Sequence, residues 1–325
     1  MEEEQVKKIF VDGSAGTTGL RIMERLAQRS DLEVVSLPDA VRKDVAARRE
    51  ALNAADVAFL CLPDAAAIEA VSLVDNPDTV VIDTSTAHRT ADGWEYGFPE
   101  LAGRRERIAA AKRIANPGCH ATGFIALVEP LVRAGLLARD VALSAFSLTG
   151  YSGGGKKMIA DYCERLKGFD ASAPGTQPDD VNAYLGGRQY ALGQGHKHLP
   201  EIVKLCGLAV TPAFCPIVVP HYSGMETTVP VFAKDLKGTP DDVRRIYRET
   251  YAKGLVRFAE SPDEGGFLSS ARLSGLDTLE VSVAGNDERI LLVSRFDNLG
   301  KGASGAAIQN MNIVLGIPED TGLAT

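Results

Sequence analysis

Cys119 is the residue of this chain whose setting points most directly to chemistry. It follows a proline–glycine turn, Asn116-Pro117-Gly118, and opens an apolar stretch that predicts a helix continuing to Leu137. At such a junction, unpaired backbone N–H groups and the positive end of the helix dipole favour the thiolate over the thiol. Because the thiolate is the attacking form, Cys119 is a candidate nucleophile for covalent catalysis. The alternative is a small residue buried at a tight turn.

Two histidines supply candidate acid/base groups. They stand two residues apart, as His196 and His198, and Glu201 follows at an apparent helix start. If this segment is extended, both imidazoles point the same way. An imidazole titrates near neutral pH and suits proton transfer beside a thiolate. We favour His196, because its spacing from Glu201 suits a supporting carboxylate, and keep His198 as the alternative. A metal site is not expected, since no third cluster of matching ligands follows.

A glycine-rich loop near the start of the sequence predicts a dinucleotide site. The loop lies between a short buried strand at residues 9–11 and a helix expected over residues 19–28. It consists of Gly13, Ser14, Ala15, Gly16, Thr17, Thr18 and Gly19. Glycines at this spacing let the backbone turn tightly and approach a pyrophosphate, and the helix N-terminus offers N–H groups to the anion. A plain connecting turn is the alternative.

The residues after the second predicted strand bear on which dinucleotide binds. The chain reaches Ser36 with no acidic residue where a ribose 2′-hydroxyl would be held, and Arg42 and Lys43 follow. A basic neighbourhood favours NADP(H) over NAD. For Arg42 and Lys43 the alternative is a solvated pair of charges.

These residues need a fold to position them, and the first part of the chain predicts an α/β domain. Short apolar runs alternate there with helical segments, at residues 9–11, 34–35, 57–62 and 80–83. This alternation is typical of a doubly wound parallel sheet that helices cover on both faces. A C-terminal apolar helix ending near Gly316 is expected to return to this dinucleotide-binding domain.

After Cys119 the pattern changes to strands in quicker succession. They are expected at residues 141–148, 208–219, 225–233, 278–284 and 289–296, with a helix over 241–253. This order favours an α+β catalytic and dimerisation domain with a mixed sheet. The glycine-rich segment 150–157 predicts a flexible loop that binds an anion through Lys156 and Lys157, and residues 168–195 predict a long excursion. We therefore assign residues 1–118 plus 299–325 to an NADP-binding domain and residues 119–298 to a catalytic and oligomerisation domain.

Composition excludes several classes of protein. The 325 residues carry a net charge of −8 and no dense block of lysine or arginine, which argues against broad nucleic-acid binding. The five cysteines are scattered and form no CxxC pair, which fits a reducing compartment and neither a zinc cluster nor a disulfide framework. No apolar run approaches the length of a membrane span. We expect a cytoplasmic enzyme.

Together these motifs resemble the N-acetyl-gamma-glutamyl-phosphate reductase family in its short form, within the aspartate-semialdehyde dehydrogenase-like superfamily. The resemblance runs nearly end to end. Besides the glycine loop, the cysteine turn and the histidine pair, it includes the stretches at residues 83–89 (DTSTAHR), 219–225 (VPHYSGM) and 297–305 (DNLGKGASG).

The resemblance implies NADPH-dependent reduction of N-acetyl-L-glutamyl 5-phosphate to N-acetyl-L-glutamate 5-semialdehyde and phosphate, a step of arginine biosynthesis. Cys119 would form a thioester as phosphate leaves, and an imidazole would activate Cys119 and protonate the developing alkoxide. Asn298 would contact the nicotinamide end, and a homodimer or homotetramer is implied. The residues implied to bind substrate are Arg89, Asn116, Ser152, Lys156 and His221.

Two other functions remain open from the sequence. Aspartate-semialdehyde dehydrogenase shares the fold, the thioester chemistry and NADP, but places its histidine in a different context from the string at residues 195–201 (GHKHLPE). A nucleotide-sensing regulator without catalysis would have no reason to keep Cys119 together with the histidine pair.

Overall fold

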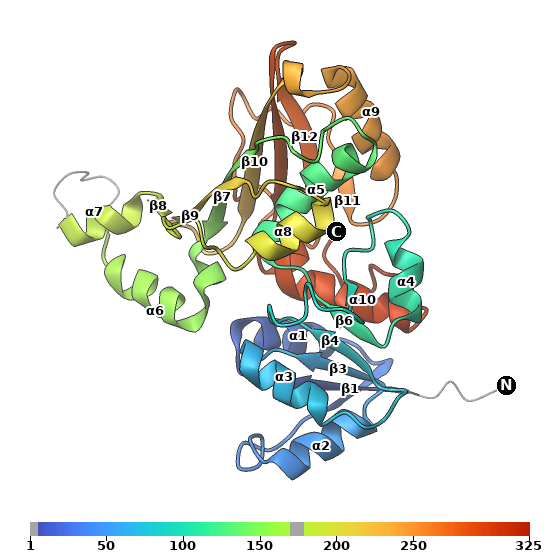
Figure 1. The fold of residues 1–325 in the computed structure, drawn as a ribbon. Helices are drawn as coiled ribbons and strands as arrows, with labels where there is room; N and C mark the ends of the chain where they lie inside the picture. Colours follow the sequence, from blue (N-terminus) through green and yellow to red (C-terminus); the bar gives the residue numbers. More distant parts are fainter. Residues whose placement is uncertain (1–5, 170–178) are drawn as a thin grey trace. The chain divides into compact units, whose positions relative to one another are not determined.

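The computed structural model describes residues 6–169 and 179–325, which form two compact units (Figure 1). The first unit comprises Met1–Gly118 and Ala303–Thr325, and the second comprises Cys119–Gly302. Residues 299–302, which we assigned to the dinucleotide-binding domain, therefore group with the second unit.

The first unit is built on a six-stranded sheet in which every neighbouring pair is parallel, in the order β2-β1-β3-β4-β6-β5. The strands are β1 (Lys7–Asp12), β2 (Leu32–Val35), β3 (Val57–Leu60), β4 (Val80–Asp83), β5 (Glu95–Tyr96) and β6 (Arg113–Ala115). The helices are α1 (Thr17–Leu26), α2 (Val45–Ala54), α3 (Asp64–Ser72), α4 (Arg104–Ala110) and α10 (Gly305–Val314), which follows a π-helical turn (Gly300–Ser304).

Alternate side chains of these strands build two separate cores. Ile9 and Val11 of β1 face one side, where they meet buried side chains of α1, α4 and α10. Phe10 faces the other side, with buried side chains of α2 and α3. Because both faces are covered, the strands read as continuous apolar runs, which is why the sequence predicted a parallel sheet. The predicted doubly wound architecture is confirmed.

The second unit contains a seven-stranded mixed sheet in the order β11-β12-β13-β10-β7-β9-β8. The pairs β7/β9 and β11/β12 are parallel and the other pairs are antiparallel, which confirms the predicted mixed sheet. Its strands are β7 (Ser144–Gly150), β8 (Arg188–Gln189), β9 (Ala213–Val219), β10 (Met225–Phe232), β11 (Val256–Phe258), β12 (Leu279–Gly285) and β13 (Arg289–Phe296). Its helices are α5 (Cys119–Arg133), α6 (Gly155–Arg165), α7 (Asp179–Leu185), α8 (Leu199–Cys206) and α9 (Pro240–Thr250), with 3-10 turns at Tyr151–Gly154 and Ala233–Asp235.

Helix α5 is the central helix of the second unit and carries Cys119 at its first position. It packs on β10 and β13 and contacts α8 and α9. Pro130 lies inside this helix and has no N–H to give to the carbonyl of Ala126. The hydroxyl of Tyr251, the residue directly after α9, donates to that carbonyl at 2.6 Å, and Tyr247 of α9 donates to the carbonyl of Leu127 at 2.6 Å. Two tyrosines thus satisfy the backbone at the proline.

Three local expectations differ from the structure. The segment 150–157 is not an open loop: it forms a 3-10 turn and then the start of α6. Helix α5 ends at Arg133 and not at Leu137, because Gly135 follows with a positive φ of 72°. The short strand β11 was not predicted, since three residues give too little periodicity to detect. Part of the predicted excursion at 168–195 lies outside the described residues.

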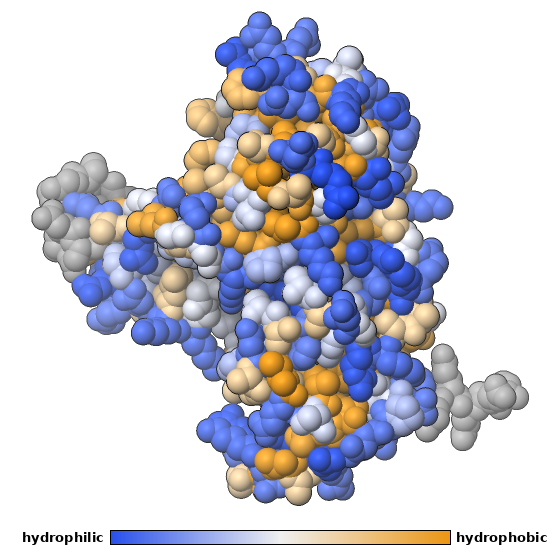
Figure 2. All heavy atoms as spheres, in the orientation of Figure 1, coloured by the Kyte–Doolittle hydropathy of each residue, from blue (hydrophilic) through white to orange (hydrophobic). Residues whose placement is uncertain are grey.

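In the part of the chain that the structure describes, no helix is long and apolar enough to cross a membrane. The face drawn in Figure 2 is mostly hydrophilic, with smaller apolar patches on both units.

Candidate functional site

The predicted dinucleotide loop connects β1 to α1 in the first unit. Gly13 has a φ of +86°, and a Cβ at this position would lie 2.3 Å from the carbonyl oxygen of Cys61 at the end of β3. The backbone here can be formed only by glycine. At Gly16, by contrast, a Cβ would meet nothing closer than 3.5 Å. The fold alone does not require Gly16, which leaves the approach of a ligand as a reason for its small size.

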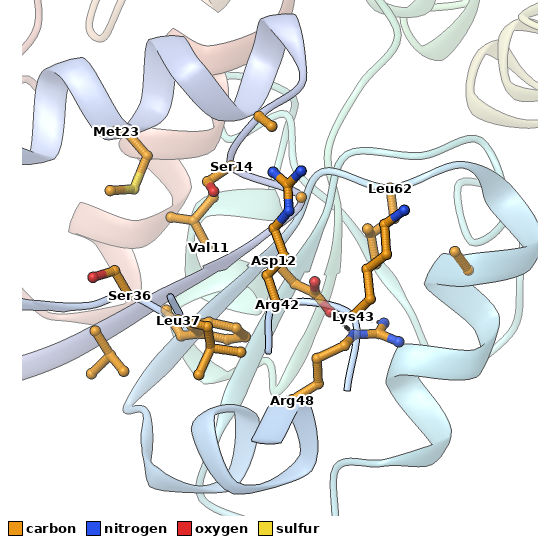
Figure 3. Close-up of a pocket in the computed structure, with 15 residues that line it drawn as sticks. Val11, Asp12, Ser14, Met23, Ser36, Leu37, Arg42, Lys43, Arg48 and Leu62 are labelled. Carbon is orange, nitrogen blue, oxygen red and sulfur yellow. Dashed lines mark hydrogen bonds and ion pairs between the residues drawn. The ribbon is translucent and has the colours of Figure 1, made fainter. Parts of the chain in front are cut away.

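A cavity of about 400 Å³ opens beside this loop (Figure 3). Of the predicted cofactor residues, Gly13, Ser14, Ala15, Ser36, Arg42 and Lys43 line it. Thr17, Thr18 and Gly19 form the first turn of α1, which Gly16 precedes as the N-cap. The side chains of Arg42 and Lys43 rise into the cavity from the segment between β2 and α2. The residues predicted from the sequence therefore form much of the cavity wall around the glycine loop and the Arg42–Lys43 segment.

Arg48 is a third cation in this cavity and was not predicted from the sequence. Its guanidinium lies 2.9 to 3.0 Å from a carboxylate oxygen of Asp12, and it is also within 3.6 Å of Glu69. Burial is the main influence on Asp12 and raises its pKa, while the hydrogen bond from Arg48 acts in the opposite direction. Arg48 lies within the helical pattern of α2, so nothing in its local sequence marks it as a cavity residue.

Cys119 is half-buried at the start of α5 in the second unit. Gly302 packs directly against it: a Cβ on Gly302 would lie 3.1 Å from the Cβ of Cys119 and 3.1 Å from the carbonyl oxygen of Asp297. The N–H of Gly302 donates to that same Asp297 carbonyl at 3.0 Å. Residues 297–302 thus form a close-fitting support for the nucleophile.

The histidine pair does not lie in an extended segment, contrary to our expectation. Residues 196–198 form a turn, and the two rings meet edge to face with centroids 4.7 Å apart. His196 is half-buried, whereas His198 is only 4% exposed. A substrate can therefore reach His196 more readily than His198.

Glu201 does not orient His196, which corrects a second expectation. The Nδ1 atom of His196 accepts from the backbone N–H of His198 at 3.2 Å, and its Nε2 atom faces the hydroxyl of Tyr190 at 3.5 Å. Both ring nitrogens are thus directed away from Glu201, which is buried in the first turn of α8.

A chain of polar groups continues from His196 into the core. The hydroxyl of Tyr190 lies 2.7 Å from Nε2 of His120, and Nδ1 of His120 lies 2.7 Å from the hydroxyl of Ser147 on β7. Ser147 in turn lies 2.9 Å from the hydroxyl of Thr227 on β10. These contacts join α5, the sheet and the segment after β8 around the two histidine rings.

Burial keeps the members of this chain neutral. It is the main cause that lowers the pKa of His120 to about 3, with His196 and Lys197 adding to the effect. Burial also lowers the pKa of His196 to about 4, again with a contribution from Lys197. The pKa of Tyr190 is raised well above its usual value, first by burial and then by the nearby charge of Cys119. Cys119 is therefore near enough to Tyr190 for its charge to act on the Tyr190 hydroxyl.

His120, Tyr190 and Ser147 are site residues that sequence reasoning missed. His120 adjoins Cys119, which was a usable signal, but Tyr190 lies in a segment rich in glycine and Ser147 lies in the middle of a strand. Within the described ranges 6–169 and 179–325, no group of three or more acidic, histidine or cysteine side chains is arranged to hold a metal ion.

A second polar cluster in the second unit holds the predicted substrate residue Ser152 and the predicted cofactor residue Asn298. Ser152 is buried, and its hydroxyl accepts from Nδ2 of Asn298 at 3.0 Å. The Oδ1 atom of Asn298 accepts from the N–H of Gly224 at 3.0 Å. Asn298, which we expected at the nicotinamide end, therefore ties together the 3-10 turn at 151–154 and the turn before β10.

His221 and Lys156 differ in their surroundings. His221 is half-buried, and its Nε2 atom is buried without a hydrogen-bond partner. Burial lowers its pKa, while a hydrogen bond with the backbone of Gly224 and the charge of Asp297 raise it. Lys156 is exposed on the first turn of α6. The Nε2 atom of His221 is thus available to hydrogen-bond a ligand, whereas Lys156 would act on a ligand mainly through its charge.

In the first unit, Arg89 and Asn116 are linked to each other. The Nε atom of Arg89 donates to the carbonyl of Asn116 at 3.0 Å, and Nη2 donates to the carbonyl of Thr84 at 3.1 Å. The buried amide of Asn116 donates to the carbonyl of Ala303 at 3.0 Å and accepts from Asn310 at 3.4 Å. The side chain of Asn116, which we expect to contact substrate, thus also holds the turn that leads to Cys119.

Most of the chain matches two known protein families. Residues 119–298 match the family described as semialdehyde dehydrogenase, dimerisation domain, and residues 37–111 match the semialdehyde dehydrogenase NAD-binding domain. The chain is 44% identical to N-acetyl-gamma-glutamyl-phosphate reductase 2 of Nostoc sp., over 97% of this chain and 99% of the relative. It is 45% identical to the N-acetyl-gamma-glutamyl-phosphate reductase of Brucella ovis, over 95% of this chain and 99% of the relative.

The chain belongs to the N-acetyl-gamma-glutamyl-phosphate reductase family. The resemblance drawn from the sequence motifs is thereby confirmed. The match to the NAD-binding family also establishes that this reductase carries the domain for a nicotinamide dinucleotide.

Solved structures extend the likeness of this reductase at the level of the fold. Aspartate semialdehyde dehydrogenase II from Vibrio cholerae superimposes with a TM-score of 0.70 at 18% identity, over 96% of this chain and 98% of that chain. The aspartate semialdehyde dehydrogenase with NADP from Candida albicans gives a TM-score of 0.62 at 16% identity, over 96% of this chain and 99% of that chain. At these identities the likeness concerns architecture alone.

Proposed function

We propose that this reductase converts N-acetyl-L-glutamyl 5-phosphate to N-acetyl-L-glutamate 5-semialdehyde and phosphate with NADPH, a step of arginine biosynthesis. The observation that carries the proposal is the placement of Cys119 at the first position of α5, in one electrostatic environment with Tyr190 and hence with the histidine cluster. The nearly full-length identity with named reductases supports the choice of substrate.

The residues of the second unit perform the covalent steps. The thiolate of Cys119 attacks the acyl carbon, a C–S bond forms, and the C–O bond to phosphate breaks with its electron pair leaving on phosphate. Once the carbonyl carbon of the thioester has been reduced, the C–S bond breaks and the thiolate of Cys119 is regenerated as the aldehyde leaves. His196 is the imidazole we place beside the reacting carbonyl, because it is more accessible than His198.

NADP(H) is the proposed cofactor, and the cavity of the first unit fits it. The backbone of the glycine loop can accept a pyrophosphate, and Arg42 and Lys43 can hold a 2′-phosphate beside the ribose. Bound there, the reduced cofactor supplies the hydride. Arg48 contributes positive charge to the same cavity, although its ion pair with Asp12 offsets part of that charge.

His221 and Arg89 are the proposed ligands for the anionic groups of the substrate. His221 has the unpartnered Nε2 atom, and Arg89 lies in the short-form motif at residues 83–89. Lys156 is a weaker candidate that acts through its charge. For Ser152 and Asn298 we propose an indirect part, because the bond between their side chains fixes the turn that precedes α6.

We also propose that the protein works as a homodimer in the cytoplasm, built through the open face of the mixed sheet. Phe146, Phe232 and Leu291 are 44%, 54% and 41% exposed, and strand register places them on the face opposite α5. An exposed apolar sheet face of this kind is typical of an interface. The family description of residues 119–298 as a dimerisation domain supports a second copy as the occupant. All five cysteines are free thiols, the form that a reducing compartment maintains.

The deciding experiment runs the reaction in reverse. Reduction of NADP is followed with N-acetyl-L-glutamate 5-semialdehyde plus inorganic phosphate, and separately with L-aspartate 4-semialdehyde, in wild type and Cys119→Ser. We expect phosphate-dependent turnover of the acetylated compound alone, lost in Cys119→Ser while NADPH binding is retained. Turnover of L-aspartate 4-semialdehyde instead would assign the other activity of the superfamily, and turnover that survives Cys119→Ser would remove the thioester mechanism.

A further inference from the structure

We propose that His196 acts as a neutral hydrogen-bond donor, with its Nε2–H directed at the oxygen of the reacting carbonyl, and that it is not the base that takes the proton of Cys119. This role presupposes the reductase activity proposed above. It adds the protonation state in which His196 serves that activity.

The Nδ1 atom of His196 is committed as an acceptor. The backbone N–H of His198 donates to it at 3.2 Å. A hydrogen on Nδ1 would point at that N–H, so the neutral ring carries its hydrogen on Nε2. If the ring turned over, a carbon would face the N–H of His198 and the bond would be lost. The backbone of the turn therefore selects one tautomer.

The Nε2 atom of His196 is only loosely engaged. It lies 3.5 Å from the hydroxyl of Tyr190, which is the outer limit of a hydrogen bond. The same hydroxyl lies 2.7 Å from Nε2 of His120, so His120 and not His196 holds Tyr190 in place. The hydrogen on Nε2 of His196 can pass to an incoming oxygen without leaving a strong bond unmade.

A buried framework fixes this arrangement from behind. His120, Ser147 and Thr227 are 2%, 0% and 0% exposed, and hydrogen bonds of 2.7 and 2.9 Å join them in a row. The ring of Phe214 lies 5.1 Å from the ring of His196. His196 therefore rests on groups that are themselves held by two strands and α5, as a preorganised donor requires.

The electrostatic surroundings agree with a neutral ring. The charge of Lys197 in the same turn acts on His196, and the rings of His120 and His198 both pack edge to face with it. Burial foremost, and then Lys197, hold the pKa of His196 near 4. A ring that is neutral near pH 7 offers one N–H and keeps its lone pair on Nδ1, where His198 occupies it.

The chemistry calls for a donor at this place. Attack of the thiolate on the acyl phosphate puts negative charge on the carbonyl oxygen until phosphate is expelled. Reduction of the thioester puts charge on the same oxygen until the thiolate is expelled. That oxygen is a carbonyl oxygen in both substrate and aldehyde product, so it needs stabilisation and no net proton transfer. The dipole at the start of a helix favours a thiolate without the help of a base, and Cys119 is the first residue of α5.

Two substitutions of His196 separate a donor from a base. His196→Gln places an amide N–H near the position of Nε2 but cannot serve as a base, and His196→Leu has similar bulk and no donor. We expect kcat to fall about 10-fold in His196→Gln and about 100-fold or more in His196→Leu, the usual loss for one oxyanion donor. Equal losses in both variants would overturn the proposal.

The state of Cys119 gives an independent readout that needs no turnover. The rate of alkylation by iodoacetamide is measured against pH by peptide mapping, in a Cys163→Ser background that removes the exposed thiol. Burial raises the pKa of Cys61 to about 12 and also raises that of Cys206, so these thiols react slowly. We expect the profile of Cys119 in both His196 variants to stay within about 2-fold of wild type. Slower alkylation by about 10-fold near pH 7 would identify His196 as the base and overturn the proposal.

Failure of the proposed function would be recognised separately. If wild type does not turn over either aldehyde, the assigned reaction is wrong, whereas the alkylation profiles still report whether His196 controls Cys119.

Discussion

The cofactor cavity of the first unit and the histidine cluster of the second unit are built in opposite ways. The cavity is open and charged, and its contacts come from short stretches of sequence, the glycine loop and the segment with Arg42 and Lys43. The cluster is largely buried and neutral, and its members are drawn from positions 120, 147, 190, 196 and 227. In the function we propose, the cavity binds the cofactor through backbone and charge, and the cluster works through fixed hydrogen bonds away from water.

This difference teaches where each region is vulnerable. The part of the cavity formed by backbone should lose its shape when a side chain is added to a glycine. The charged part should lose affinity for an anion when a cation is removed. A buried hydrogen-bond cluster is destabilised when one of its members becomes charged or loses its partner, because the remaining polar groups cannot form hydrogen bonds with water instead.

The largest effect should come from adding a side chain to the glycine loop. Gly13→Ala puts a Cβ 2.3 Å from the carbonyl oxygen of Cys61 at a positive φ, so we expect the free energy of unfolding to fall by about 3 kcal/mol or more. The matched control is Gly16→Ala, where the nearest atom is 3.5 Å away. We expect it to melt like wild type while its Kd for NADPH rises about 10-fold, as measured by calorimetry and fluorescence titration. Equal melting temperatures of the two variants would show that the backbone at position 13 does not require glycine.

The second effect concerns the buried cluster at low pH. The pKa of His120 is about 3 in the folded protein against 6.5 when unfolded, so the unfolded state binds the proton more strongly. Stability from this group is therefore complete above pH 6.5 and is lost as pH falls toward 3. At about pH 5 the loss should be about 2 kcal/mol. Chemical denaturation of wild type and His120→Asn at several pH values measures it.

Subtracting the two curves removes the contribution of other titrating groups such as His196 and Asp12. His120→Asn should be less stable at neutral pH and flatter below pH 6.5 than wild type. If the two curves run parallel, His120 is not the neutral, buried centre of the cluster.

The third effect tests the charged wall of the cavity. Arg42→Ala and Lys43→Ala each remove a cation from beside Ser36 without touching the glycine loop. We expect each to weaken NADPH binding by about 10-fold and leave NADH binding within about 2-fold, because NADH lacks the 2′-phosphate. Titrating both cofactors gives the ratio directly. Equal losses for the two cofactors would place these cations elsewhere than at the 2′-phosphate.

The smallest effect should come from Lys156. It is exposed on α6, so its charge acts on substrate only through water. Lys156→Ala should raise KM for the acyl phosphate by about 2- to 3-fold and leave kcat unchanged, with the neighbouring Lys157→Ala as the matched control. A larger change in kcat would mean that α6 closes on the substrate.

The same contrast explains what the sequence could and could not predict. The pattern of apolar residues predicted the longer strands of both sheets. Strands buried on both faces, such as β3 and β4, are continuous apolar runs, and burial alternates along β9 and β10. Local motifs predicted Gly13, Arg42 and Cys119, since consecutive residues build those features. Tyr190 and Ser147 were missed because they meet His120 only after the sheet of the second unit has formed.

The error about Glu201 has a physical reason as well. Spacing along the chain suggested that Glu201 supports His196, but the turn at 196–198 directs Nδ1 toward the N–H of His198. A backbone donor two residues away replaced the expected carboxylate. Sequence spacing gives neighbours only when the local conformation is known.

Pro130 in α5 has a consequence for how this protein assembles. Without the hydroxyl of Tyr251 the carbonyl of Ala126 would be buried with its helical partner missing, so the helix that carries Cys119 is not self-sufficient. Helix α9 completes it from more than a hundred residues further along the chain, and Tyr247 adds a second bond to Leu127. During synthesis the nucleophile's helix therefore waits for the C-terminal half of the second unit. The two helices should gain protection from hydrogen exchange as a single cooperative unit.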